Sequence, residues 1–262
     1  MELDDAYANA AHIAGADAYP ARWAAQAVAF RETESDTGHA RLDHPYGPGE
    51  REALDLFLPK GRPAGLCVFV HGGYWLRFDR SYWSHLARGP LARGWAVAMP
   101  SYDLCPDVTI AEITRQIACA VTSAAAEIDG PIALTGHSAG GHLVARMAVA
   151  GVLHNDVARR IRSVVPISPV ADLRPLLKTS MNAQLGLDMA AASAESPVLM
   201  QPLDISVTVW VGAAERPAFL DQARWLGEAW ECPVIEAEGR HHFDVIDALG
   251  DPDSTMVQAL TG

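Results

Sequence analysis

The sequence Gly-His-Ser-Ala-Gly at residues 136–140 joins a potential nucleophile to the glycines that a sharp turn requires. Residues 132–135 have the composition of a short buried strand, and residues 142–149 have that of an apolar helix. A serine at such a junction is held out on a tight turn, where its hydroxyl can reach a substrate. The pattern predicts that Ser138 is the nucleophile of a serine hydrolase, although an ordinary turn could share the pentapeptide.

A serine hydroxyl is a weak nucleophile, so it needs a base to remove its proton and an acid to hold that base. Residues 239–242, Gly-Arg-His-His, follow the last predicted strand, and only one of the two histidines can be the base. We expect His242, because the apolar Phe243 and Ile246 would anchor the next helix and fix the residue before it. His241 is the alternative.

The acid is expected to be Glu215, which follows the strand predicted at 206–211. Ligands of open α/β sheets bind at the carboxyl ends of the strands, so the acid should lie after a strand. Asp204 precedes that strand, and Asp221 falls within the next predicted helix. The alternative for Glu215 is a solvated carboxylate near a helix start, where it would favour the helix dipole.

Backbone N–H groups for a developing oxyanion are expected in the sequence His-Gly-Gly-Tyr-Trp at residues 71–75, directly after the strand predicted at 66–70. Glycine lets the backbone come close to a substrate. We expect the N–H groups of Gly73 and Tyr74 to act together with that of Ala139. His71 is interpreted as a brace for this loop.

A metal site is the other chemistry that these residues could support. His241 and His242 with Asp244 offer three metal-ligating side chains. No third ligand at helical spacing and no His-Glu-x-x-His pattern accompanies the histidines. We therefore expect neither a metal nor a cofactor.

Strands that alternate with helices form the predicted scaffold for these groups. Buried strands are predicted at 66–70, 95–99, 132–135, 163–167, 206–211 and 234–237, with long helices at 109–128 and 217–230. Residues 41–58 predict a strand, a turn and a second strand. The alternation predicts an α/β fold with a mostly parallel central sheet and helices on both faces.

Two regions lie outside this alternation. Residues 1–36 are predicted to be an N-terminal helical segment packed on the core, with short helices interrupted near Pro20. Residues 37–262 are predicted to be the main domain. Within it, residues 172–202 contain three prolines and are predicted to form a small helical cap over the site.

Composition limits the function classes. Half of the 262 residues are hydrophobic, which is enough for one large domain. The net charge of −12 and the lack of a basic stripe argue against nucleic acid or an anionic membrane as partners. The four cysteines have no Cys-x-x-Cys spacing, and the chain begins without a signal-peptide pattern, so a cytoplasmic protein with reduced thiols is expected. A homodimer is left open.

Several segments of the chain carry a resemblance to a known family. The most discriminating are residues 71–75 together with Pro-Ser-Tyr-Asp-Leu-Cys-Pro at 100–106. Further matches lie at 136–143, 168–176, 196–197, 215–219 and 242–244, and at Asn182. By these motifs, which span residues 66 to 246 or so, the sequence resembles the kynurenine formamidase (arylformamidase) family of α/β-hydrolases.

This resemblance implies a Ser–Asp–His triad, onto which Ser138 and His242 map directly. Glu215 stands where the family usually has Asp, and related hydrolases use Glu in this role. The resemblance also implies a small-molecule substrate: N-formylkynurenine, hydrolysed to kynurenine and formate in tryptophan catabolism.

Three further residues are candidates for contacts with an aryl substrate. Trp75 and Tyr102, together with Tyr74 of the oxyanion motif, could stack on its ring, and Asn182 could bind a polar group. The structural alternatives are core packing for the two rings and a cap-stabilising hydrogen bond for Asn182. Two other functions remain open: a carboxylesterase for small acyl esters, and a catalytically inactive receptor with the same fold.

Overall fold

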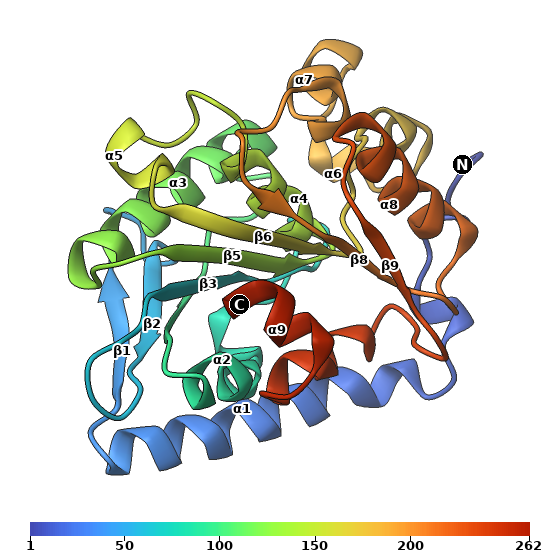
Figure 1. The fold of residues 1–262 in the computed structure, drawn as a ribbon. Coiled ribbons are helices and arrows are strands. Elements are labelled where there is room, and N and C mark those ends of the chain that lie inside the picture. Colours follow the sequence, from blue (N-terminus) through green and yellow to red (C-terminus); the bar gives the residue numbers. More distant parts are fainter.

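A single nine-stranded sheet forms the centre of the computed structural model, which describes residues 1–262 (Figure 1). The strands lie in the order β1-β2-β4-β3-β5-β6-β8-β9, and the short β7 pairs with β6. β2 is antiparallel to both of its neighbours, and every other pair is parallel. The strands are β1 Ala40–Pro45, β2 Ala53–Phe57, β3 Leu66–Val70, β4 Ala96–Pro100, β5 Ile132–His137, β6 Ile161–Ile167, β7 Ser206–Val207, β8 Val209–Gly212 and β9 Val234–Ala237.

Helices cover both faces of the sheet, which confirms the predicted fold class (Figure 1). The α-helices are α1 Tyr19–Asp36, α2 Arg88–Ala92, α3 Ile110–Glu127, α4 Ala139–Met147, α5 Asn155–Ala158, α6 Asn182–Leu185, α7 Met189–Ala194, α8 Pro217–Ala229 and α9 Thr255–Thr261. Short 3-10 helices are η1 Ala10–His12, η2 Ala16–Ala18, η3 Arg80–Tyr82, η4 Ser84–Ala87, η5 Arg174–Lys178, η6 Pro197–Leu199 and η7 Val245–Gly250. No helix combines the length and the apolar composition needed to cross a membrane.

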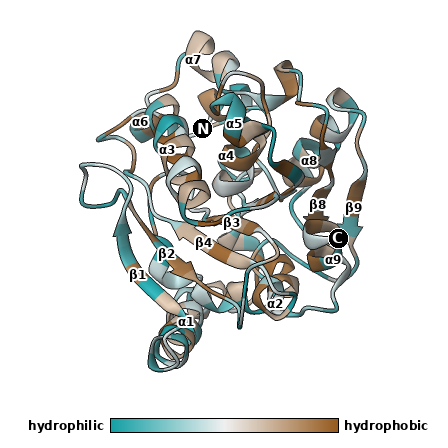
Figure 2. Cartoon of the chain, turned by 60° about the vertical axis from the view of Figure 1, so that its left-hand side comes forward, coloured by the Kyte–Doolittle hydropathy of each residue, from teal (hydrophilic) through white to brown (hydrophobic).

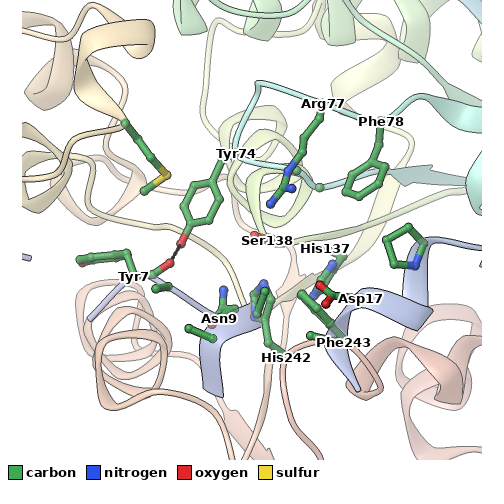
Figure 3. A pocket seen from close by; sticks show the side chains of 18 of the residues that line it. Tyr7, Asn9, Asp17, Tyr74, Arg77, Phe78, His137, Ser138, His242 and Phe243 are labelled. Carbon is green, nitrogen blue, oxygen red and sulfur yellow. Dashed lines mark hydrogen bonds between the residues drawn. The ribbon is translucent and has the colours of Figure 1, made fainter. Parts of the chain in front are cut away.

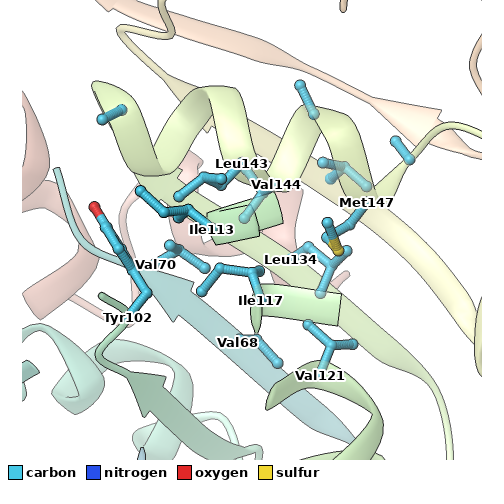
Figure 4. Close-up of a cluster of buried hydrophobic side chains, with 14 of the residues drawn as sticks. Val68, Val70, Tyr102, Ile113, Ile117, Val121, Leu134, Leu143, Val144 and Met147 are labelled. Atoms are coloured by element: carbon cyan, nitrogen blue, oxygen red, sulfur yellow. The ribbon is translucent and has the colours of Figure 1, made fainter. Parts of the chain in front are cut away.

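Alternate residues of each central strand enter two separate hydrophobic cores. Val68 and Val70 of β3 pack in the core beneath α3, α4 and α8, whereas Cys67 and Phe69 pack against α1 and α9. This division follows from the two-residue period of a strand. Figure 4 shows the first core, where Leu143 and other side chains of α3 and α4 meet β3 and β5. Figure 2 shows that β1, at the edge of the sheet, is largely hydrophilic, whereas the central strands are hydrophobic.

Local signals explain where the principal helices begin. At the start of α3, the Thr109 hydroxyl accepts a hydrogen bond from the Glu112 N–H at 3.2 Å, and the Glu112 carboxylate accepts one from the Thr109 N–H at 2.7 Å. This capping box satisfies two backbone donors that the helix cannot. Pro217 occupies the first turn of α8, where its missing N–H costs nothing.

The N-terminal segment differs from its sequence prediction in one respect. The predicted interruption near Pro20 is wrong, because α1 is one continuous helix of 18 residues and Pro20 lies in its first turn. The interior face of α1 buries Trp23, Ala27 and Phe30. Residues before Tyr19 form η1, η2 and turns, and they run from this helix towards the carboxyl ends of the strands.

Residues 172–202 form η5, α6, α7 and η6 beside α4 and α8 (Figure 1). Their attachment to α4 and α3 is polar: Glu195 accepts hydrogen bonds from Arg146 of α4 at 3.0 Å and from Thr114 of α3 at 2.8 Å. Their attachment to the end of α8 is through the Trp230 indole N–H, which donates to the carbonyl of Pro197 at 3.1 Å. These contacts hold the segment next to the cavity described below.

Candidate active site

Ser138 occupies a strained turn between β5 and α4, with φ of 57° and ψ of −115°. Its two flanking glycines are required by packing. A Cβ atom at Gly136 would collide with the carbonyl of Gly140, and one at Gly140 would collide with the carbonyl of Val70. The predicted turn therefore exists because only glycine permits the strand and helix to approach this closely, and it holds Ser138 out at the carboxyl edge of the sheet.

Glu215 lies just after β8, and its side chain is fully buried. One carboxylate oxygen accepts hydrogen bonds from the Gly212 N–H at 2.8 Å and from the Ser168 hydroxyl at 2.5 Å. The other oxygen lies 2.6 Å from Nδ1 of His242. Because three donors converge on one carboxylate, hydrogen bonds to both of its oxygens hold its position relative to the histidine.

The loop that carries His242 is brought to the acid by another close approach. A Cβ atom at Gly212 would collide with the carbonyl of Arg240, so glycine lets the loops after β8 and β9 pack together. The hydrogen bond to Glu215 requires a proton on Nδ1 of His242, which leaves Nε2 without a proton in the neutral ring. The rest of this ring lines a cavity that Ser138 also lines. His242 and Ser138 form no direct hydrogen bond in the structure, a contact that commonly tightens when substrate binds.

The predicted oxyanion loop packs directly on the turn that carries Ser138. A Cβ atom at Gly72 would lie 2.6 Å from the carbonyl of His137, so glycine is needed for this approach. Gly73 and Tyr74 both have positive φ, of 112° and 54°, and neither of their N–H groups donates to a protein acceptor. Ala139 is the first residue of α4, where an N–H has no partner within the helix. The three predicted donors thus adjoin Ser138, the candidate nucleophile.

His71 stays within this loop and does not reach the cavity. Its Nδ1 hydrogen bonds to the carbonyl of Gly72 at 2.8 Å, and its ring stacks on Tyr102 with centroids 4.3 Å apart. Burial lowers the pKa of His71 to about 4, so the ring is neutral near pH 7. These contacts suit a bracing role.

Three predicted substrate contacts do not line the cavity: Trp75, Tyr102 and Asn182. Trp75 is completely buried, with its ring edge against His142. Tyr102 is completely buried and donates its hydroxyl hydrogen to the carbonyl of His71 at 2.9 Å. Asn182 binds the backbone of Leu187 through both ends of its amide. Core packing and a local turn account for all three residues.

The alternative base and the alternative acid lie away from Ser138. His241 hydrogen bonds to the Tyr19 hydroxyl at 3.0 Å, and its Nδ1 lies 3.2 Å from the Asp244 carboxylate. Asp221 is half-exposed on α8, 4.0 Å from Arg224. Since His242 faces Glu215 while His241 and Asp244 face each other, the three side chains considered for a metal do not converge.

The cavity beside Ser138 has a volume of about 600 Å³ and includes residues that the sequence did not indicate (Figure 3). Residues from the N-terminal segment form much of its wall, whereas residues 172–202 contribute only Ser180 and Met181. The lining side chains of interest are aromatic (Tyr7, Trp23, Tyr74, Phe78, Trp83, Phe243) or polar (Asn9, Asp17, Arg77, His137). Of these residues, Tyr74, His137 and Phe243 lie within the sequence motifs, and Arg77 and Phe78 closely follow the oxyanion motif. The residues of the N-terminal segment lie in no motif.

The N-terminal wall is held by specific contacts to the main domain. The Tyr74 hydroxyl donates to the carbonyl of Tyr7 at 2.7 Å, and the Tyr7 hydroxyl accepts from the Gln222 amide at 2.9 Å. Arg216 forms an ion pair with Asp5 at 2.6 Å. Burial raises the pKa of Tyr74 well above its usual value, so its hydroxyl remains a donor across the physiological range.

Known proteins resemble this chain in sequence and in structure. Residues 67–258 match the sequence profile of the alpha/beta hydrolase family. Kynurenine formamidase of Drosophila melanogaster is 32% identical over 84% of this chain and 80% of that protein. Kynurenine formamidase of Danio rerio is 28% identical over the same shares of the two chains.

A solved structure from Silicibacter sp. TM1040, provisionally described as a thioesterase, is 63% identical over the whole of both chains and has a TM-score of 0.98. These findings confirm the resemblance inferred from the motifs. The chain belongs to the alpha/beta hydrolase family, in which the kynurenine formamidases are among its relatives.

Proposed function

We propose that this alpha/beta hydrolase cleaves N-formyl arylamines, with N-formylkynurenine as the preferred substrate, giving the arylamine and formate. One observation carries the proposal: Ser138 and the Glu215–His242 pair meet at a cavity walled by aromatic rings. Such a wall suits an aryl group, because offset stacking and edge contacts stabilise aromatic pairs. The similarity to two kynurenine formamidases over most of the chain supports the same substrate class.

The proposed reaction begins when His242 Nε2 removes the hydroxyl proton as Ser138 Oγ attacks the formyl carbon. The N–H groups of Gly73, Tyr74 and Ala139 stabilise the oxyanion that forms. His242 then gives its proton to the aryl nitrogen, the carbon–nitrogen bond breaks, and the arylamine leaves a formyl ester on Ser138. Water attacks this ester with His242 as base, Ser138 regains its proton, and formate departs.

Glu215 fills the role that aspartate usually has in the family. Its second oxygen is held by Gly212 and Ser168, so the longer side chain still presents one oxygen to His242. In this position it orients the ring and stabilises the imidazolium that forms in the transition state. The neighbouring His137 adds no competing charge, because burial and then the nearby His242 keep its pKa well below the usual value.

Replacement of the nucleophile tests the serine mechanism. Ser138→Ala should lower kcat by several orders of magnitude, since the attacking oxygen is removed. The fold should be retained, because the Ser138 hydroxyl points into a cavity and not into a packed core. Single-turnover kinetics and thermal unfolding of the variant would measure both effects. Turnover within tenfold of the unmodified protein would exclude Ser138 as nucleophile.

A second candidate is hydrolysis of small acyl esters or thioesters, which the same residues could catalyse. The Silicibacter structure favours it, because a protein 63% identical to this chain is provisionally described as a thioesterase. The two candidates differ in the acyl and leaving groups that the cavity accepts. A formyl group is small, so a formamidase can have a tight acyl side and a roomy aryl side.

The deciding experiment compares N-formylkynurenine, p-nitrophenyl acetate and acetyl-CoA with one enzyme preparation. A formamidase should show the highest kcat/KM for N-formylkynurenine. On one aryl leaving group, kcat/KM should fall from formyl to acetyl to butyryl. A rise along that series, with no turnover of N-formylkynurenine, would favour the ester or thioester alternative. Ser138→Ala serves as the background control for all three substrates.

A further inference from the structure

The cavity beside Ser138 contains two opposite charges that have no protein partner. Asp17 and Arg77 both line it, and Figure 3 shows the Asp17 carboxylate and the Arg77 guanidinium directed into it. Neither forms a salt bridge or a side-chain hydrogen bond, and they do not pair with each other; Arg77 lies only near the Phe78 ring, 5.6 Å from its centroid. The remaining carboxylate of the cavity, Asp4, is already engaged by the Ser180 N–H at 2.6 Å.

A third polar group in the same wall is also without a full set of partners. Asn9 is only 6% exposed, lines the cavity, and its Oδ1 accepts no hydrogen bond. An unsatisfied buried polar atom is costly, and native proteins rarely retain one without a reason. In Figure 3 the Asn9 amide lies beside His242 and below Ser138. The cavity is therefore aromatic on part of its wall and prepared for polar contacts on another part.

We infer that Asp17, Arg77 and Asn9 form a subsite for the α-amino-acid head group of the substrate. This inference rests on the proposed function, because it places the formamide of the same molecule at Ser138. Arg77 binds the α-carboxylate, which matches the planar fork of a guanidinium. Asp17 binds the α-ammonium, and Asn9 supplies a further polar contact.

Charge balance explains why the subsite needs both Arg77 and Asp17. The protein carries a net charge of −12, so an anionic group approaches its surface unfavourably unless a local cation attracts it. Arg77 supplies that cation at the cavity. The ammonium and the carboxylate of the zwitterion are both attached to the α-carbon. Because Asp17 and Arg77 do not pair with each other, each can bind the group of opposite charge, and neither charge is left uncompensated. Hydrogen bonds between charged groups are about twice as strong as neutral ones. The subsite thereby selects an aryl formamide that carries an amino-acid side chain.

The test uses two substrates that differ only in the head group: N-formylkynurenine and 2-formamidoacetophenone, which keeps the formamide, the ring and the ketone. Arg77→Met and Asp17→Asn should each lower kcat/KM for N-formylkynurenine by roughly 10- to 100-fold, mainly through KM. Neither substitution should change kcat/KM for 2-formamidoacetophenone by more than about twofold. The α-methyl ester of N-formylkynurenine should lose its sensitivity to Arg77→Met but not to Asp17→Asn.

Matched controls remove a charge of the same sign at the other edge of the sheet. Arg62 precedes β3 and Asp129 precedes β5, and both are exposed. Arg62→Met and Asp129→Asn should therefore leave kcat/KM for both substrates unchanged. If Arg77→Met lowers kcat/KM equally for both substrates, or for neither, the subsite assignment is wrong.

The same assay separates failure of the subsite from failure of the proposed function. If the unmodified protein hydrolyses both formamides with equal kcat/KM, the formamidase proposal holds and the head-group subsite is refuted. If it hydrolyses neither, the proposed function fails and the subsite inference fails with it.

Discussion

The buried hydrogen bond between Glu215 and His242 is the main contact within the candidate active site. The two side chains are 2.6 Å apart and almost fully removed from solvent. In such surroundings an ion pair or charge-assisted hydrogen bond is stronger than at the surface. The proposed rate enhancement depends on this pair, because His242 must hold the correct tautomer and then carry a positive charge.

Glu215→Gln should lower kcat roughly 10²- to 10⁴-fold, because the amide cannot stabilise the charged ring or enforce its tautomer. The loss should be smaller than that of Ser138→Ala, since the nucleophile and the oxyanion donors remain. Steady-state kinetics on the proposed formamide substrate would measure it. Asp221→Asn is the control, because that carboxylate is half-exposed and 4.0 Å from Arg224. If the control variant loses more activity, the acid has been assigned to the wrong residue.

The two adjacent histidines should respond differently to truncation. His242→Ala removes the proposed base and should lower kcat by several orders of magnitude. His241→Ala removes a hydrogen bond to Tyr19 and the contact with Asp244, so it should affect stability more than turnover. Parallel measurement of kcat and of the urea midpoint for both variants separates the effects. A larger kcat loss for His241→Ala would reverse the assignment.

The glycine turns at the ends of β3, β5 and β8 show how elements are brought close enough to share a site. In each turn, a Cβ atom added to the glycine would collide with a carbonyl oxygen of a neighbouring segment. These glycines are Gly72, Gly140 and Gly212. A side chain at any of these positions would separate the elements. Rigid positions of this kind allow loops after several strands to contribute to one reaction centre.

Gly140→Ala should destabilise the protein by more than about 3 kcal/mol, because its Cβ would lie far closer to the Val70 carbonyl oxygen than van der Waals contact allows. Gly250→Ala is the matched control, since a Cβ there has open space and no positive φ. That variant should stay within about 0.5 kcal/mol of the unmodified protein. Urea unfolding at pH 7.5 would measure both, and equal effects would contradict the packing argument.

Buried neutral histidines determine how the whole molecule should respond to acid. Burial lowers the pKa of His71 and of His142 to about 4, and burial also lowers that of His137. In the unfolded chain the same groups titrate near pH 6.5. Below that pH the unfolded state takes up protons that the folded state does not, so acid favours unfolding.

Stability should therefore fall as the pH is lowered from 6.5 towards 4. His71 and His142 together correspond to roughly 2 kcal/mol per pH unit near pH 5, and His137 acts in the same direction. Burial raises the pKa of Asp55 and Asp247, and these two carboxyl groups oppose the loss because they take up protons more readily in the folded state than in the unfolded chain. Urea midpoints at pH 7.5, 6.0 and 5.0 would measure the net effect. Constant stability between pH 7.5 and 5.0, or an increase towards acid, would show that the histidines do not dominate.

The sequence by itself was enough to predict the α/β fold and to select Ser138, Glu215 and His242. Short-range rules suffice for these predictions: strands show themselves by apolar runs, and glycines mark turns whose sterics are local. Because parallel strands end at one edge of a sheet, residues that follow different strands must lie near each other. The structure brings Glu215 within hydrogen-bonding distance of His242 and places Ser138 at the same cavity.

Only the tertiary structure decided which side chains face the cavity beside Ser138. Trp75 and Tyr102 stand in discriminating motifs, yet they turn into the core. Asn9 and Asp17 belong to no motif, yet they line the cavity because the N-terminal segment folds back over the carboxyl edge of the sheet. A motif describes the conformation of a few neighbouring residues. The direction of a side chain towards a cavity depends on packing between segments far apart in sequence, and no local pattern records that packing.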